Sequence, residues 1–404
     1  MLYIRDNRTL QRFVDSLGGV RALALDTEFV REGSYEPHLA LLQIATDRGE
    51  VVVVDPFAAS PLESLFAVLA DRSIEKVLHS GQQDISILAT RMGRVPEALF
   101  DTQVAAAFLG YGERIGLADL LAAELEVQLE KSETYTNWLK RPLTPQQLAY
   151  AASDVEHMLP LAEKLKNRLA ELGRTAWVEE VLREIYDPSR FETDPFTLYL
   201  RVRRASSLSR RELAVLRELA VWREEEAQRT DRPRRSVATD ECLIELAKRQ
   251  PHNSAQLSDM RGLGRRYQRE GAPELLEAIR RGKAVPESEL PPQIEIEQVE
   301  PEVQSTVDLL IAFVKNRGRE IGVAPAYLAT PEELAQMVRA AQRGEEPPQV
   351  RVLSGWRAQC VGRDLLRLLS GEAHLELKGG RVEFVSPAGW DKPGLQPKGG
   401  GEGE

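Results

Sequence analysis

The chain has 404 residues, a formal net charge of −10 at pH 7, and 42% apolar and 29% charged residues. These values predict a soluble globular protein of two to four domains, at about 100–200 residues each. No apolar run approaches the roughly 20 residues of a membrane span, and the first residues lack the pattern of a signal peptide. The two cysteines, Cys242 and Cys360, are far apart, which argues against a disulfide framework or a cysteine zinc site. We therefore expect a cytoplasmic protein with no membrane association.

The first 190 residues predict an α/β domain. A short strand at residues 3–4 and a helix that ends near residue 18 come first. Three strands joined by short connections follow, and they predict an antiparallel meander at residues 22–29, 39–46 and 51–54. Beyond them the patterns predict one strand, at residues 76–79, and helices at residues 61–70, 81–92, 100–109, 116–125 and 144–172. Thr144 is a suitable N-cap for the last helix, and Pro145 suits its first position.

The rest of the chain predicts helices separated by linkers. We expect a linker or an irregular connecting helix at residues 191–208, a helical domain at 209–284, a linker rich in Pro and Glu at 285–300, and a second helical domain at 301–372. Residues 373–404 predict a tail with a hairpin at Gly379-Gly380 and a disordered end. The negative net charge hides a basic segment, because residues 201–283 contain 20 Lys and Arg against 13 Asp and Glu. Such a segment favours contact with a nucleic-acid backbone.

An offset of 91 residues relates the two helical segments. The offset aligns Thr239 with Thr330, Glu241 with Glu332, Leu243 with Leu334, Gly264 with Gly355 and Arg266 with Arg357. A fixed offset that is kept across a turn, a helix and a second turn predicts a duplicated domain. The alternative, that these residues are simply common at helix starts, explains one match but less easily the whole set.

Two carboxylates stand two residues apart in the predicted strand 22–29. Asp26 and Glu28 share one face of that strand, because alternate side chains point the same way. Like charges side by side are unfavourable unless a cation lies between them, and a divalent metal is the usual one. Taken alone, a solvated strand end is the simpler explanation.

Three further elements supply polar side chains of the same kind. Asp84 lies in the first turn of the predicted helix 81–92, where an acid also favours the helix dipole. Tyr150 and Asp154 are four residues apart and share a helix face, although a half-buried aromatic and a surface acid would also explain them. His79 is also explained as a hydrogen-bonded core residue. Together, four carboxylates and a phenol could hold two Mg²⁺ ions about 4 Å apart and orient a water, which indicates phosphodiester hydrolysis.

These motifs resemble those of the ribonuclease D family. Residues 26–29 are similar to its first exonuclease motif, residues 79–84 to its second and residues 150–154 to its third, while residues 100–108 and 138–147 also match. The resemblance covers residues 1–190, and Tyr150 places it among the DEDDy-type 3′→5′ exonucleases. It implies a ribonuclease H-like fold, two Mg²⁺ ions with Mn²⁺ as an alternative, and release of nucleoside 5′-monophosphates from RNA 3′ ends.

Carried over residue by residue, the resemblance also implies roles for single side chains. It implies metal binding by four acids and positioning of the water by a phenol: Asp26, Glu28, Asp84, Asp154 and Tyr150. It further implies that residues just after the first acid contact the terminal nucleotide. We therefore name Thr27 and Phe29 as candidate substrate-binding residues, and we add His79 from the second motif. A place in the core is the alternative for Phe29 and His79.

The first helical segment, residues 209–282, resembles the HRDC domain, a small nucleic-acid-binding module. The resemblance rests on residues 219–224, Asp231, Pro233 and residues 237–243. Residues 301–371 are a weaker copy, with Val314 and Lys315 near the expected places of Trp222 and Arg223. Because its surroundings are not notably basic, packing against the nuclease domain is an alternative to nucleic-acid binding for this copy.

The sequence therefore predicts an α/β ribonuclease H-like exonuclease domain followed by two small all-α HRDC-like domains. The expected function is that of a monomeric 3′→5′ exoribonuclease for RNA with an accessible 3′ end, such as tRNA precursors. A 3′→5′ DNA exonuclease is one alternative. A nucleic-acid-binding protein with an inactive nuclease domain is another, although such a domain should have lost a metal ligand and all four acids are present.

Overall fold

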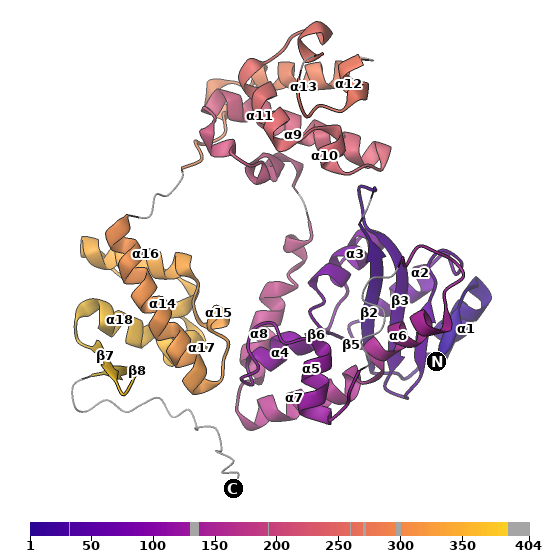
Figure 1. Cartoon of the computed structure of the whole chain (residues 1–404), viewed down its shortest axis with the longest axis vertical. Coiled ribbons are helices and arrows are strands. Elements are labelled where there is room, and N and C mark those ends of the chain that lie inside the picture. Colours follow the sequence, from indigo (N-terminus) through magenta and orange to yellow (C-terminus); the bar gives the residue numbers. More distant parts are fainter. Residues whose placement is uncertain are drawn as a thin grey trace.

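The computed structural model of the chain describes residues 1–31, 33–129, 137–192, 194–258, 260–269, 272–295 and 300–386. The predicted disordered end, residues 387–404, lies outside this part of the chain. Figure 1 shows an N-terminal α/β domain, drawn in indigo to magenta, and two helical domains. Among the described helices, none is long and apolar enough for a membrane span.

The N-terminal domain is built on a six-stranded mixed sheet. Its strand order is β1-β4-β3-β2-β5-β6. The strands are β1 (Leu2–Ile4), β2 (Ala22–Val30), β3 (His38–Thr46), β4 (Val51–Val54), β5 (Glu75–Leu78) and β6 (Leu99–Asp101). The predicted meander of β2, β3 and β4 is antiparallel, while β1 pairs with β4, and β5 with both β2 and β6, in parallel. The strand β3 is buried along almost its whole length, and β2 is buried at residues 23–25 and 27, because helices pack on the sheet.

Helices cover both faces of this sheet. They are α1 (Asn7–Ser16), α2 (Glu63–Leu69), α3 (Gln82–Met92), α4 (Thr102–Ala107), α5 (Leu117–Leu125), α6 (Pro145–Glu156), α7 (Met158–Glu171) and α8 (Thr175–Ile185). The helix α6 lies across β2, β3 and β4. Thr144 caps α6 as predicted, because its hydroxyl accepts from the backbone N–H of Gln147 at 3.1 Å and its own N–H donates to the Gln147 side chain at 2.8 Å.

Two predicted elements of this domain are wrong in their bounds. The predicted single helix 144–172 is divided at His157 into α6 and α7. Pro160 explains the break, because it has no N–H to donate to the carbonyl of Glu156. The predicted helix 100–109 starts two residues late, since residues 99–101 pair with β5 as a short edge strand. Three residues are too few for a strand period to be recognised in the sequence.

The first helical domain contains α9 (Arg210–Thr230), α10 (Arg234–Val237), α11 (Asp240–Arg249), α12 (Arg265–Arg269) and α13 (Pro273–Ala284). The segment for which we expected a linker or an irregular connecting helix, residues 191–208, contains the short 3₁₀ helices Pro195–Arg201 and Ala205–Ser207. Its side chains Leu198, Tyr199 and Leu208 are buried in the same hydrophobic core as α9 to α13. This domain therefore begins before residue 209.

The second helical domain repeats the plan of the first. It contains α14 (Pro301–Ile321), α15 (Pro325–Leu328), α16 (Pro331–Arg343), α17 (Gly355–Arg357) and α18 (Arg363–Ser370), with a π-helical turn between the last two. The helices α14, α15 and α16 begin 91 residues after α9, α10 and α11, and α9 and α14 have 21 residues each. This agreement supports the predicted duplication. With this offset, Phe313 and Val314 occupy the positions that correspond to Trp222 and Arg223. These positions lie one residue earlier than the pair that we expected, Val314 and Lys315.

The predicted hairpin follows the second helical domain. Its strands are β7 (His374–Lys378) and β8 (Arg381–Val385), which pair antiparallel. The turn residues Gly379 and Gly380 have φ of +55° and +76°, a conformation that glycine adopts without strain. Phe384 of β8 packs against Phe313 of α14, with ring centroids 5.5 Å apart. The hairpin is therefore not isolated but rests on the helical domain.

Candidate active site

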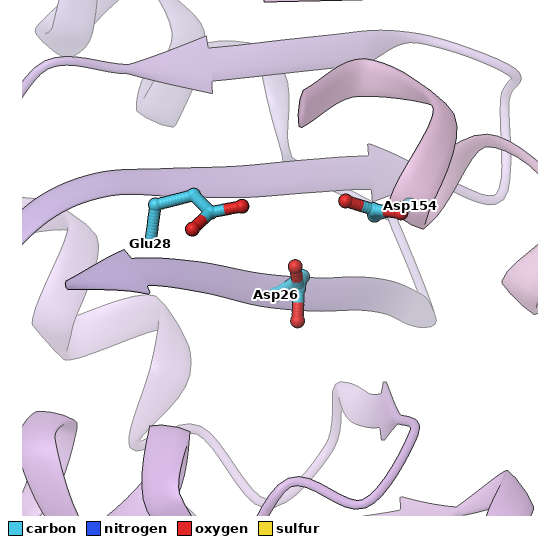
Figure 2. Close-up of side chains that lie close together, drawn as sticks. All are labelled: Asp26, Glu28 and Asp154. Carbon is cyan, nitrogen blue, oxygen red and sulfur yellow. The ribbon is translucent and has the colours of Figure 1, made fainter. Parts of the chain in front are cut away.

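Three of the predicted acids meet on one face of the sheet. Asp26, Glu28 and Asp154 each offer a carboxylate oxygen, and these oxygens lie within 4.8 Å of one another. Figure 2 shows Asp26 and Glu28 rising from the same strand, β2, while Asp154 reaches toward them from α6. Like charges at this separation repel strongly unless protons or a cation intervene. The geometry therefore defines a candidate metal centre.

Local structure places these side chains. Asp26 lies opposite Gln43, and Glu28 lies opposite Leu41, in the antiparallel pair of β2 and β3. A bulge between Glu28 and Phe29 ends the regular register just after the second acid, where a bulge re-aims the following side chains. Because α6 crosses the same strands, its Asp154 faces the two acids of β2.

Asp84 reaches the site from α3 but does not join the three-acid cluster. The Thr27 hydroxyl donates a hydrogen bond to Asp84 Oδ1. The turn before α3 is held by Asp101, whose carboxylate accepts from the backbone N–H groups of Ser80 and Gly81, each at 3.0 Å. These hydrogen bonds hold the Asp84 side chain in a fixed position near the other three acids.

Burial raises the pKa values of all four acids, and the charges of neighbouring acids in the site raise those of Asp26 and Glu28 further. Burial and the charges of Asp84, Asp154 and Glu28 raise the pKa of Asp26 well above its ordinary range. Burial, followed by the charges of Asp154 and Asp84, raises the pKa of Glu28 to about 8. Burial raises the pKa of Asp154 to about 7. Burial also raises the pKa of Asp84, against the effect of the Thr27 hydrogen bond. A cation is thus needed to keep the site fully ionised at neutral pH.

The donor set fits a hard divalent cation. Carboxylate oxygens are the protein ligands that Mg²⁺ prefers, usually with several waters retained. Gln43, directly opposite Asp26, is fully buried, and neither of its side-chain amide atoms has a hydrogen-bond partner among the described residues. A buried amide without partners costs about 1–3 kcal/mol. Water ligands of a bound cation would satisfy such an amide.

Tyr150 lies one helical turn before Asp154. Burial and the charges of Asp154, Glu28 and Asp26 raise the pKa of its phenol to about 12, so the hydroxyl stays protonated. The Tyr150 ring packs beside Trp138, with centroids 6.2 Å apart and planes tilted by 31°. The phenol can therefore donate a hydrogen bond at neutral pH.

The three candidate substrate-binding residues have different surroundings. The Thr27 side chain is buried, and its hydroxyl is used by Asp84. The ring nitrogens of His79 lie 2.9 Å from Thr102 Oγ1 and 3.0 Å from the Ile115 carbonyl oxygen, which favours the core alternative for this histidine. Phe29 is half-buried, and the Arg31 guanidinium lies 5.2 Å from its ring centroid.

Sequence reasoning missed Asp101. Besides the turn before α3, its carboxylate accepts from the Tyr186 hydroxyl at 2.7 Å and from the N–H of Gln103 at 2.9 Å. An acid followed by Thr102 and a run of small apolar residues is typical of an N-cap, and this signal was present in the sequence. No signal in the sequence indicates the long-range hydrogen bonds through which Asp101 supports the turn before Asp84.

Comparisons with known proteins identify the families of two parts of the chain. Residues 1–170 match the family model described as 3'-5' exonuclease, and residues 212–279 match that of the HRDC domain. Fold and site thus define a 3′–5′ exonuclease that carries an HRDC domain.

Full-length relatives narrow the class further. The chain is 36% identical to ribonuclease D of Granulibacter bethesdensis, over 90% of this chain and 91% of that protein. It is 37% identical to ribonuclease D of Gluconacetobacter diazotrophicus, with the same coverage. The crystal structure of Escherichia coli RNase D, described as an exoribonuclease involved in structured RNA processing, superimposes with a TM-score of 0.78 at 28% identity, over 91% of this chain and 98% of that one.

The chain belongs to the ribonuclease D family. It is an enzyme, a 3′→5′ exoribonuclease, and the predicted order of an α/β exonuclease domain followed by a helical HRDC region is confirmed.

Proposed function

We propose that this exoribonuclease trims structured RNAs with an accessible 3′ end, such as tRNA precursors, as a cytoplasmic monomer. The meeting of Asp26, Glu28 and Asp154 beside Tyr150 is the observation that carries the proposal. The description of the E. coli relative as an enzyme of structured RNA processing supports the substrate class. Cys242 and Cys360 are both buried and unbridged, which is consistent with a reducing compartment.

Four carboxylates would hold two Mg²⁺ ions, with Mn²⁺ as an alternative: Asp26, Glu28, Asp84 and Asp154. When bound, the ions would lower the pKa of the attacking water and offset negative charge at the scissile phosphate. Tyr150 would use its protonated hydroxyl to orient that water in line with the phosphorus atom. Thr27 would hold Asp84 in place through the hydrogen bond between their side chains. Each cycle would release one nucleoside 5′-monophosphate.

The contacts to RNA divide between the two kinds of domain. Phe29 is our remaining candidate for a side chain against the terminal nucleotide, because it directly follows Glu28 and is only half-buried. The first helical domain would contact the RNA backbone through exposed basic side chains, among them Arg232, Arg235, Arg261 and Arg265. Such contacts would recruit structured RNA without reading its sequence.

The proposal is tested with matched 5′-labelled RNA and DNA strands that carry single-stranded 3′ ends. We expect a ladder that shortens from the 3′ end of RNA with Mg²⁺, and no ladder with EDTA or with the Asp26→Ala variant. Asp154→Asn should lower the rate of RNA hydrolysis by roughly 10³-fold or more, because it removes a carboxylate that would bind the metal needed in the transition state. A tRNA precursor with a 3′ extension should be shortened to the edge of its structured part.

Other outcomes would change the proposal in defined ways. Faster shortening of DNA than of RNA would indicate a DNA exonuclease. Turnover of Asp154→Asn close to that of the unmodified protein would contradict the assignment of the metal site. Near-normal folding of this variant is expected, because the substitution relieves repulsion within the acidic cluster, and circular dichroism checks it.

A further inference from the structure

The segment before α6 is fastened to the sheet by a single arginine. Arg141 Nε and Nη2 donate to the two carboxylate oxygens of Asp55, at 2.6 and 3.1 Å. Arg141 Nη2 also donates to the carbonyl oxygen of Ala40 on β3 at 2.9 Å, and Nη1 donates to that of Trp138 at 2.6 Å. One guanidinium thus ties the backbone of this segment to β3 and to the end of β4.

The carboxylate that receives Arg141 is itself fully bonded. The Asp55 side chain is 3% exposed, and its oxygens also accept from the Tyr3 hydroxyl at 2.8 Å and from the backbone N–H of Phe57 at 3.1 Å. Although burial acts to raise the pKa of Asp55, the bonds from Arg141 and Tyr3 hold it below its ordinary value. A buried and bidentate ion pair of this kind has one favoured geometry. The anchor is therefore rigid.

Trp138 connects this anchor to the active site. Its side chain is 6% exposed and packs in a small core with Leu41 of β3 and Ala151 of α6. On the other side its ring packs against Tyr150. The Tyr150 hydroxyl has no hydrogen bond to a protein group within the described part of the chain. Packing against Trp138 is therefore what holds the orientation of the phenol before substrate binds.

We infer that Arg141 is a positioning residue for Tyr150, acting through Trp138. The inference rests on the proposed role of Tyr150 in orienting the water. Arg141 holds the backbone of Trp138, and the indole in turn supports the phenol beside the acidic cluster. Displacements of about 1 Å at a reacting group can lower a rate by about 10²-fold. Loss of the anchor should therefore lower kcat while leaving metal affinity and KM nearly unchanged.

The chain contains a matched control for this anchor. Arg168 of α7 pairs with Glu124 of α5, whose side chain is also 3% exposed, and Glu124 accepts from the Tyr111 hydroxyl at 2.8 Å. Like the Arg141 anchor, this set has an arginine, a buried carboxylate and a tyrosine hydroxyl, although Arg168 bonds Glu124 through Nη1 alone and Lys164 also pairs with Glu124. This set joins α5 to α7 and contacts none of the four acids or Tyr150 in the described structure.

The test is a double-mutant cycle in single-turnover rate on a short single-stranded RNA. We compare Arg141→Lys, Arg168→Lys and Tyr150→Phe with the two double variants that contain Tyr150→Phe. Lysine keeps the charge opposite the buried carboxylate but cannot make the bidentate bonds. Arg141→Lys should lower the single-turnover rate about 10-fold to 100-fold, and it should cause no further loss once Tyr150 is Phe. Arg168→Lys should leave the single-turnover rate unchanged in both backgrounds.

Thermal unfolding separates folding from positioning, because both lysine variants should lower Tm by similar amounts. If Arg141→Lys does not fold, Trp138→Leu supplies the same cycle. Rate losses of Arg141→Lys and Tyr150→Phe that multiply in the double variant would overturn the inference and leave the role of Tyr150 intact. A Tyr150→Phe variant with an unchanged rate would overturn that role and the inference together, while the metal-site assignment would still rest on Asp154→Asn.

Discussion

The two helical domains share one arrangement of helices but meet the nuclease domain through different chemistry. The first domain is contacted by the loop between β2 and β3, which reaches toward α10 in Figure 1. There the Tyr35 hydroxyl donates to Glu224 Oε1 at 2.6 Å and accepts from Gln228 Nε2 at 2.9 Å and Arg234 Nη2 at 3.0 Å. The Arg234 guanidinium also lies 4.6 Å from the Tyr35 ring centroid. Hydrogen bonds dominate this contact, and the Tyr35 ring also packs against the core of the first helical domain.

The second domain is joined to the nuclease domain by a continuous hydrophobic core. Trp356 stacks on Trp177 of α8, with centroids 4.8 Å apart, and its edge meets Phe108 at 5.6 Å. The buried Arg174 guanidinium donates to the carbonyl oxygens of Phe108 at 2.6 Å and of Ile321. The alternative that we considered for this copy, packing against the nuclease domain, is the observed arrangement.

The two helical domains also differ in how their cores are packed. The first copy keeps its own separate core and leaves its basic surface exposed. The second has Phe313 and Val314 where the first has Trp222 and Arg223, and its helices share a core with α4 and α8. We therefore expect the second domain to unfold together with the nuclease domain, and the first to unfold separately.

The largest expected effect is that of Trp356→Ala. Removing this buried aromatic should lower the free energy of unfolding of the nuclease and second helical domains together by about 3–5 kcal/mol. Trp222→Ala is the matched control, because Trp222 is 5% exposed and Trp356 is 6% exposed. It should destabilise the first domain alone. Hydrogen exchange followed by mass spectrometry reports each domain separately, and unchanged exchange in α8 of Trp356→Ala would contradict the shared core.

Divalent metal should have the next largest effect. At a concentration 100 times its Kd, Mg²⁺ or Mn²⁺ should stabilise the nuclease and second helical domains by about 2.7 kcal/mol and leave the first domain unchanged. At a fixed metal concentration, the stabilisation by the metal should grow with pH. In the metal-free protein the pKa of Glu28 is about 8 and that of Asp154 about 7, against ordinary values of 4.5 and 3.8. The folded state therefore holds protons that the unfolded chain has lost.

The sign of this pH dependence follows from those protons. Stability of the metal-free protein should fall as pH rises from roughly 4 to 8, because ionisation of the acids is opposed only in the folded state. Metal restores that stability by replacing the protons. Differential scanning calorimetry at pH 6 and pH 8.5, with and without Mg²⁺, measures the effect. An equal rise in Tm at both pH values would mean that the acids do not bind the ion.

The smallest effect on stability is expected for Tyr35→Phe. The substitution removes one hydroxyl between domains while Glu224 keeps its ion pair with Arg234, so the free energy of unfolding should change by less than about 1 kcal/mol. Activity on structured RNA should fall several-fold, since the first domain is no longer fixed relative to the metal site. Activity on a short single strand should be unchanged.

Tyr267→Phe is the control for this variant. The Tyr267 hydroxyl donates to Glu226 at 2.6 Å, an equivalent bond that lies wholly within the first domain. Tyr267→Phe should leave the ratio of activity on structured RNA to activity on a short single strand as it is in the unmodified protein. Equal losses on both substrates for Tyr35→Phe would show that the contact serves the nuclease domain itself and not the placement of the first helical domain.

Much of the site could be predicted because it depends on local periods. A strand repeats every two residues, so Asp26 and Glu28 had to share a face, and a helix brings Tyr150 next to Asp154. The same logic identified the meander, the cap at Thr144 and the duplication. Each of these features is encoded by residues within a few positions of one another, or by a fixed offset of 91 residues.

Tertiary structure alone decided the remaining features. The separation of Asp84 from the three-acid cluster depends on its bond with Thr27, 57 residues away in sequence. The anchor of Tyr150 depends on Arg141 and Asp55, 86 residues apart, and the docking of the second helical domain depends on Arg174 and Ile321, 147 residues apart. Such partners are selected by the shape and charge of surfaces that exist only after the chain has folded, and no local period records them.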